Sequence, residues 1–109
     1  MARVVDTGMT NFGHYRSLVR HLRKHVELDY PISIRRTRLP DGLDGDATLA
    51  NGRFVVRINR ELTENSAIDT VIHEISHCVV LESHQGHGPA WGMAYSRVYQ
   101  EYLVWLDGI

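Results

Sequence analysis

Only one cysteine, Cys78, occurs among the 109 residues, so the chain forms no internal disulfide and no cysteine-rich zinc ribbon. The sequence also lacks an apolar run of the roughly 18 residues that a membrane span requires. Its first residues do not contain the apolar stretch of a secretory signal. These absences predict a cytoplasmic protein that does not associate with membranes and whose fold does not depend on disulfides.

The composition is that of an ordinary globular protein. Hydrophobic residues make up 43% and charged residues 23% of the chain, which excludes intrinsic disorder. We find no internal repeat, low-complexity segment or linker, and the length suits one domain. The sequence therefore predicts a single domain that spans residues 1–109.

Charge is distributed unevenly along the chain, although the net charge is only −1. Residues 1–60 carry 11 − 6 = +5, and residues 61–109 carry 1 − 7 = −6. A basic region attracts phosphate backbones or an acidic partner. The alternative is that the arginines, among them Arg35, Arg36 and Arg38, occupy solvated faces and pair with the acidic part. We favour the alternative here because charge asymmetry alone is a weak indicator.

Hydrophobic spacing in the first half predicts one helix and three strands. Apolar residues recur at three- and four-residue steps over residues 11–26, as in an amphipathic helix. Three later runs have the character of strands: 32–35, 47–50 and 53–60. Asn51 and Gly52 separate the last two, and this dipeptide favours a type I′ hairpin turn, which needs positive φ at both central residues.

The second half predicts two further helices. The first begins after a cap at Thr63, Asn65 or Ser66 and fades near Ser83. Pro89 suits the first position of the last helix, whose apolar stripe consists of Trp91, Tyr95, Val98, Tyr102 and Trp105. The expected fold class is α+β, with helices around a small antiparallel or mixed sheet.

An HExxH motif, His73 to His77, lies within the first of these two helices. Residues four apart on a helix have Cβ atoms about 5–6 Å from each other. Two imidazoles so placed can bind one metal ion at about 2.0–2.1 Å from each nitrogen. Glu74 lies beside the pair, where its carboxylate can reach a metal-bound water without taking a coordination position.

A catalytic zinc takes three protein ligands and keeps one position open, and two histidines compete for the third place. If the helix continued, His84 would lie about 10 Å beyond His77 along the axis, too far to bind the same ion. His87 follows a glycine and precedes Gly88 and Pro89, so the chain can turn back there. We therefore favour His87.

These motifs resemble those of the SprT-like (Spartan-type) zinc metalloproteases, in which an HExxH helix is followed by a His-Gly-Pro-x-aromatic segment. Here the segment runs from His87 to Trp91, and the likeness extends over about residues 61–105. The resemblance implies a minimal zincin-like domain that binds one zinc ion through His73, His77 and His87, with Glu74 as the catalytic residue. It also implies that Trp91 packs behind the third ligand. An extended peptide would be held by edge pairing along strand 53–60.

Two functions follow from the motif. The first is a zinc-dependent endopeptidase acting on a protein or peptide, in which Glu74 takes a proton from water and delivers it to the leaving amine. Family members often act on DNA-associated proteins, so DNA is a secondary expected partner beside the protein or peptide substrate. An additional oxyanion donor would come from Tyr95, Tyr99, Arg97 or His84.

The second function is a non-catalytic module in which zinc is structural and the basic first half docks on nucleic acid or a protein partner. A structural site is usually closed by a fourth protein ligand, which His84 or Glu82 would supply here. Salt-sensitive DNA binding would support this alternative.

Other reactive side chains receive simpler interpretations. His21 and His25 also lie four residues apart, near His14, but have no neighbouring glutamate, so we expect a solvated or substrate-rim face. Cys78 directly follows His77, and we expect it to pack as a small apolar residue because buried thiols are usually inert.

Overall fold

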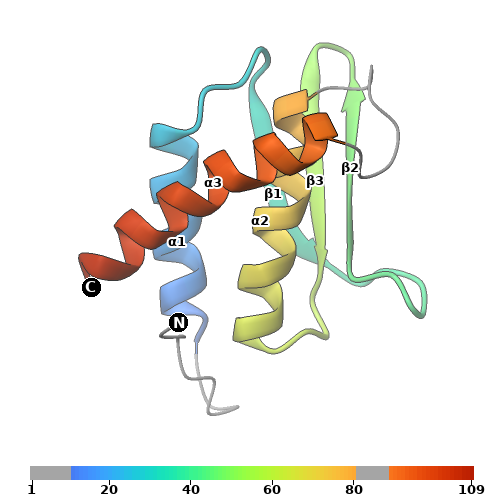
Figure 1. The fold of residues 1–109 in the computed structure, drawn as a ribbon. Coiled ribbons are helices and arrows are strands. Elements are labelled where there is room, and N and C mark those ends of the chain that lie inside the picture. The colour runs from blue at the N-terminus through green and yellow to red at the C-terminus, as the bar shows by residue number, and fades with distance from the viewer. Residues whose placement is uncertain (1–10, 81–88) are drawn as a thin grey trace.

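The computed structural model describes residues 11–80 and 89–109, which form an α+β fold of three helices and a three-stranded mixed sheet. The elements are α1 (Gly13–His25), β1 (Ile32–Thr37), β2 (Gly45–Ala50), β3 (Arg53–Asn59), α2 (Glu64–Val80) and α3 (Pro89–Asp107). Figure 1 shows α2 lying against the sheet, with α3 crossing over α2 and α1. The expected order of helix, three strands and two helices is confirmed.

The strand order in the sheet is β1-β3-β2. β1 runs parallel to β3, with Ile32 opposite Phe54, and β2 runs antiparallel to β3, with Gly45 opposite Ile58. β3 is therefore the central strand, and β1 and β2 form the edges. The expectation that the strand over residues 53–60 holds a peptide by edge pairing is wrong, because both sides of β3 are already paired.

The β2–β3 hairpin forms as its turn residues require. Asn51 has φ 54° and Gly52 has φ 72°, the two positive values of a type I′ turn. Beyond the turn, Phe54, Val56 and Ile58 alternate onto the face that packs against the helices and are buried. The predicted hairpin is confirmed.

Helix α2 begins at Glu64, and Thr63 supplies its cap. The Ser66 N–H donates to Thr63 Oγ1 at 3.3 Å, which decides among the three candidate caps. Its buried side includes Ile68, Val71, Ile72 and Ile75, each no more than 3% exposed. The expected end of this helix near Ser83 lies outside the described residues, as do Glu82, His84 and His87.

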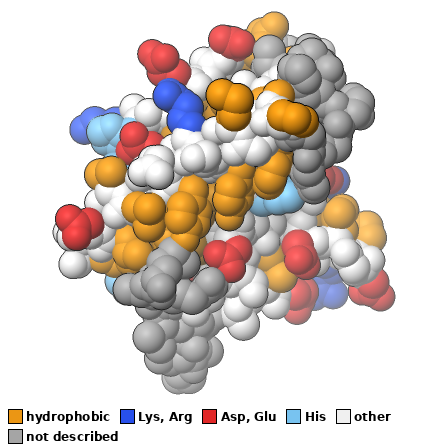
Figure 2. Space-filling view, in the orientation of Figure 1, with side chains coloured by type: hydrophobic (Ala, Val, Ile, Leu, Met, Phe, Trp, Pro, Cys, Tyr) orange, Lys and Arg blue, Asp and Glu red, His pale blue; other side chains and the backbone are white. Residues whose placement is uncertain are grey.

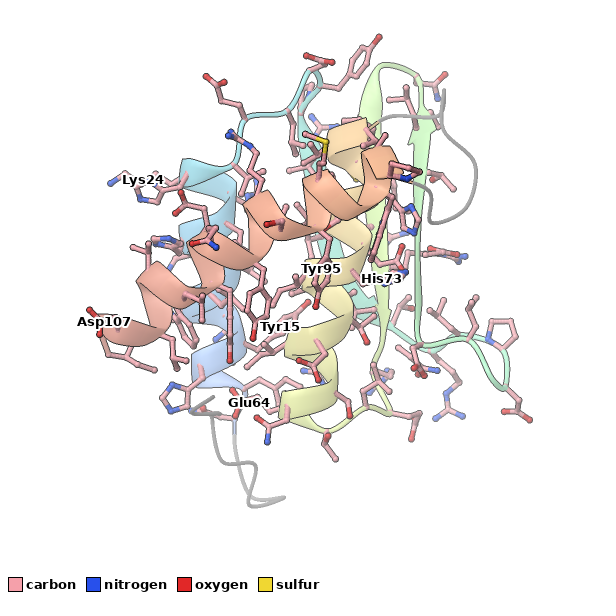
Figure 3. All side chains as sticks on the ribbon, viewed as in Figure 1. Tyr15, Lys24, Glu64, His73, Tyr95 and Asp107 are labelled. Carbon is pink, nitrogen blue, oxygen red and sulfur yellow. The ribbon has the colours of Figure 1, made fainter. Side chains whose placement is uncertain are left out.

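The start of α1 is stabilised by a residue from α2. Phe12, at the N-cap position, has φ 63° and makes no side-chain cap hydrogen bond. Instead the fully buried Glu64 accepts a hydrogen bond from the Tyr15 N–H at 2.9 Å (Figure 3). A carboxylate suits this position because the first N–H groups of a helix have no intrahelical partner and carry partial positive charge.

The phenol of Tyr15 is buried in the same region. Its hydroxyl has no hydrogen-bond partner among the residues described. Burial raises the pKa of Tyr15 to about 12, although the nearby Arg36 charge acts in the opposite direction. No helix within residues 11–80 and 89–109 is both long and apolar enough to cross a membrane.

Candidate metal centre

The two histidines of the motif lie on successive turns of α2, and their rings converge. The Nε2 atoms of His73 and His77 are 3.2 Å apart. Two nitrogens bound to one tetrahedral ion at about 2.0–2.1 Å would be separated by about 3.3–3.4 Å. The pair therefore fits a shared metal ion with little rearrangement. The distance also suits a hydrogen bond between two imidazoles.

The third ligand is not supplied by the described part of the chain. In residues 11–80 and 89–109, no group of three or more His, Cys, Asp or Glu side chains is arranged to hold a metal ion. The preferred third ligand His87 and its rival His84 both lie within 81–88, outside these residues. The assignment of His87 stays a prediction from its spacing and from the family resemblance.

Glu74 lies beside the histidine pair and is only 8% exposed. Burial, followed by the negative charge of Asp46, raises the pKa of this carboxyl to about 7. The carboxylate is thus placed in a sheltered position next to the two imidazoles. This is the position that the motif predicts for a general base.

β2 closely approaches α2 next to this carboxyl because residue 45 is glycine. A Cβ atom there would lie 2.8 Å from Thr70 Cγ2, 2.9 Å from the Arg57 carbonyl oxygen and 3.4 Å from Glu74 Cγ. Only a residue without a side chain fits such a spacing. Nothing in the sequence around Gly45 indicates this contact between β2 and the HExxH helix.

A cavity of about 300 Å³ opens between the start of β2 and α2. It is lined by Asp44, Gly45, Asp69, Thr70, His73 and Glu74. In Figure 3, His73 lies on the side of α2 that is turned toward the β2–β3 hairpin. Arg57 Nε donates to Asp46 Oδ1 at 2.9 Å, and a second contact joins Arg57 Nη2 to Asp46 Oδ2, so this pair links β2 to β3.

Trp91, in the first turn of α3, packs against both motif histidines. Its ring centroid lies 5.1 Å from that of His73 and 5.7 Å from that of His77. The expected packing of Trp91 behind the third ligand falls outside the described residues. Tyr95 stacks on Trp91 with centroids 5.0 Å apart, so among the oxyanion candidates within the described residues it is the one that contacts the ring packed against the histidine pair.

The contact between Trp91 and Tyr95 begins a row of aromatic rings along α3. The ring centroids are 5.8 Å apart for Tyr95 and Tyr99, 5.2 Å for Tyr99 and Tyr102, and 5.9 Å for Tyr102 and Trp105. Figure 2 shows hydrophobic side chains in a row that follows α3 and ends beside a histidine. Four aromatic members of the predicted core stripe, Trp91, Tyr95, Tyr102 and Trp105, together with Tyr99, which was not part of that stripe, thus connect the core to the candidate centre.

The remaining reactive side chains have other roles. His21 Nε2 lies 2.9 Å from Glu101 Oε1 and joins α1 to α3. The expected solvated position therefore holds for His25, which is exposed, but not for His21. Cys78 is 2% exposed, and burial raises its pKa to about 12, which confirms the packing role.

Comparison with models of protein families, with curated proteins and with solved structures finds no match, so the family resemblance rests on the motifs alone.

Proposed function

We propose that this chain is a zinc-dependent metallopeptidase of the SprT-like, zincin-like kind, with one zinc ion held by His73, His77 and His87. The observation that carries the proposal is the 3.2 Å separation of the two motif imidazoles beside a buried carboxyl. When bound, zinc supplies a water of lowered pKa and polarises the scissile carbonyl. The neutral imidazoles of an HExxH pair suit this metal.

Glu74 acts as the general base. Its carboxylate takes a proton from the attacking water and afterwards gives it to the leaving amine. Two features support this role: its place next to His73 in the sequence, and its burial between α2 and β2. The cavity lined by Asp44, His73 and Glu74 gives a peptide bond access to the same side of α2.

The substrate is an extended peptide that pairs with the free edge of β2. β2 pairs only with β3 within the described sheet, so its other edge can accept a further strand. Gly45, at the start of this strand, lines the cavity together with His73 and Glu74. A peptide paired with β2 would thus run past the candidate centre. β3 cannot bind a peptide in this way, because both its edges are already paired.

The test is Glu74→Gln, measured by zinc content and by cleavage of an unfolded protein such as casein. We expect about one zinc per chain to be retained and cleavage to fall by about 10²–10⁴-fold. Glu61→Gln is the matched control because Glu61 has a side chain that is 62% exposed and pairs with Arg38. Unchanged cleavage in Glu74→Gln would remove Glu74 from the mechanism. Zinc binding without cleavage by the unaltered protein would favour the non-catalytic module.

A further inference from the structure

Part of the aromatic row along α3 is accessible to solvent. Trp91, Tyr95 and Tyr99 are half-buried. Tyr102 and Trp105, which follow them in the row, are only 3% and 6% exposed. In Figure 2, hydrophobic side chains lie at the surface along α3 up to a histidine. The first three rings thus form an accessible set, which we call the α3 row, and the last two anchor it in the core.

The rings of the α3 row expose their edges more than their faces. The planes of Trp91 and Tyr95 are inclined by 24°, and those of Tyr95 and Tyr99 by 22°. Because nearly parallel neighbours cover part of each other's faces, ring edges make up much of the surface that reaches solvent. Ring edges are positive and ring faces are negative, so a flat aromatic group laid across the row would meet it in the favoured edge-to-face geometry.

Tyr95 adds a hydrogen-bond donor to this surface. Burial, followed by the neighbouring Tyr99 and the negative charge of Asp69, raises the pKa of the Tyr95 phenol, so its hydroxyl remains protonated at neutral pH. Asp69 belongs to α2 and lines the cavity that contains His73 and Glu74. Tyr95 extends from α3 across α2 (Figure 3). The α3 row therefore comes close to one wall of that cavity.

The α3 row begins at the candidate centre. The Trp91 centroid lies 5.1 Å from that of His73, and the next two steps of the row measure 5.0 and 5.8 Å. Tyr95 and Tyr99 are therefore no more than about 10 and about 16 Å from His73. An extended peptide covers about 3.3 Å per residue, so about three residues reach Tyr95 and about five reach Tyr99. The row approaches His73 from α3, whereas β2 approaches it from the sheet.

We propose that the α3 row binds an aromatic side chain of the polypeptide substrate, about three to five residues from the bond that is cleaved. The substrate pairs with β2 on one side of the candidate centre and covers the row on the other. Aromatic side chains suit the row better than aliphatic ones because only they offer a negative face to the ring edges. This assignment rests on the proposed peptidase activity, because the bound polypeptide is taken as the substrate, but the binding itself requires no cleavage.

The experiment compares three labelled peptides of glycine, serine and alanine that differ at one position, which is phenylalanine, leucine or alanine. Binding to the full-length Glu74→Gln protein is measured by fluorescence anisotropy, and cleavage by the unaltered protein with added zinc is measured by mass spectrometry. The phenylalanine peptide should bind about 10-fold tighter than the alanine peptide and about 2- to 12-fold tighter than the leucine peptide. Its kcat/KM should be higher by similar factors, with the cleaved bond about three to five residues from phenylalanine.

Two double variants separate the rings from their hydroxyl groups. Tyr95→Leu/Tyr99→Leu should reduce the preference for phenylalanine over alanine to about twofold or less, whereas Tyr95→Phe/Tyr99→Phe should retain it. Loss of an oxyanion donor would slow cleavage of all three peptides equally and leave their ratios unchanged. Tyr30→Leu is the matched control because Tyr30 is 40% exposed but packs against Phe54 instead of the row. Circular dichroism verifies that each variant is folded.

The outcomes separate this site from the peptidase activity. Equal binding of the three peptides would overturn the proposal, whether or not they are cleaved, and so would a preference that survives in Tyr95→Leu/Tyr99→Leu. Selective binding through the two tyrosines without cleavage of any peptide would refute the peptidase and support the row as a site for aromatic segments. Sedimentation velocity should show a monomer in both proteins. A wild-type dimer that dissociates in Tyr95→Leu/Tyr99→Leu would overturn the proposal in favour of a second copy of this chain.

Discussion

Gly45→Ala tests the close approach of β2 to the HExxH helix. The added Cβ would lie 2.8 Å from Thr70 Cγ2 and 2.9 Å from the Arg57 carbonyl oxygen. The carbonyl belongs to the central strand β3, so it cannot rotate away as a flexible side chain would. β2 or α2 must therefore shift, and overpacking of this kind costs about 1–3 kcal/mol.

The size of the effect on thermal unfolding follows from the length of the chain. With 109 residues and an unfolding entropy of about 2.1 cal/mol/K per residue, each 1 kcal/mol corresponds to about 4 °C in Tm. We expect Gly45→Ala to lower Tm by about 4–13 °C. The measurement is thermal unfolding followed by circular dichroism at 222 nm, with a chelator added to both proteins.

Gly92→Ala adds the same methyl group at a position where a Cβ atom has room. Gly92 lies in α3, and a Cβ there would meet no described atom within 4 Å. Alanine should stabilise the helix by about 0.5–1 kcal/mol and raise Tm by about 2–4 °C. The two substitutions thus have opposite expected signs. If Gly45→Ala unfolded at the wild-type temperature, the close packing of β2 on α2 beside Glu74 would be refuted.

Two further predictions concern the buried contacts of α1. Tyr15→Phe removes a buried hydroxyl without a described partner and should stabilise the protein by about 1–3 kcal/mol at pH 7, as measured by urea unfolding. Because the folded pKa of Tyr15 is about 12 and the unfolded pKa is about 10, the wild type should lose stability as pH rises from about 10 through 12. Tyr15→Phe should not show this loss, and identical pH profiles would contradict the burial of the phenol. Glu64→Ala leaves the Tyr15 N–H without its acceptor and should cost about 1.5–3 kcal/mol in urea unfolding, with Glu64→Gln milder because it keeps an oxygen acceptor. A value for Glu64→Ala within about 0.5 kcal/mol of the wild type would show that the cap contributes little.

Local sequence patterns predicted the elements whose causes are local. Asn51 and Gly52 determine their hairpin through the φ values that the turn requires, and Pro89 begins α3 because its missing N–H is not needed there. The partner of β1 could not be predicted in this way. Its parallel pairing with β3 passes over β2, which lies between them in the sequence, and the alternation in β3 is the same for an edge strand as for a central one.

The candidate site also combines features that follow from local sequence and features that depend on tertiary packing. Helix periodicity alone is sufficient to bring His73 and His77 together, so their convergence followed from their spacing. Gly45 lies against Glu74, and the charge of Asp46 acts on the Glu74 carboxyl, only because β2 packs on α2. The sequence before β2 does not indicate that packing. Thr63, Asn65 and Ser66 were equally suitable as caps, and the start of the helix at Glu64 decided among them.

The order of strands in the sheet has a consequence for synthesis of the chain. Ile32 emerges 54 − 32 = 22 residues before its partner Phe54, and the Tyr15 amide emerges 49 residues before the carboxylate that accepts its hydrogen bond. At about 5–20 residues per second, the ribosome produces these partners roughly 1–10 s later. The β2–β3 hairpin is the first paired unit of the sheet that can close on the nascent chain, and it then provides the template on which the earlier strand docks.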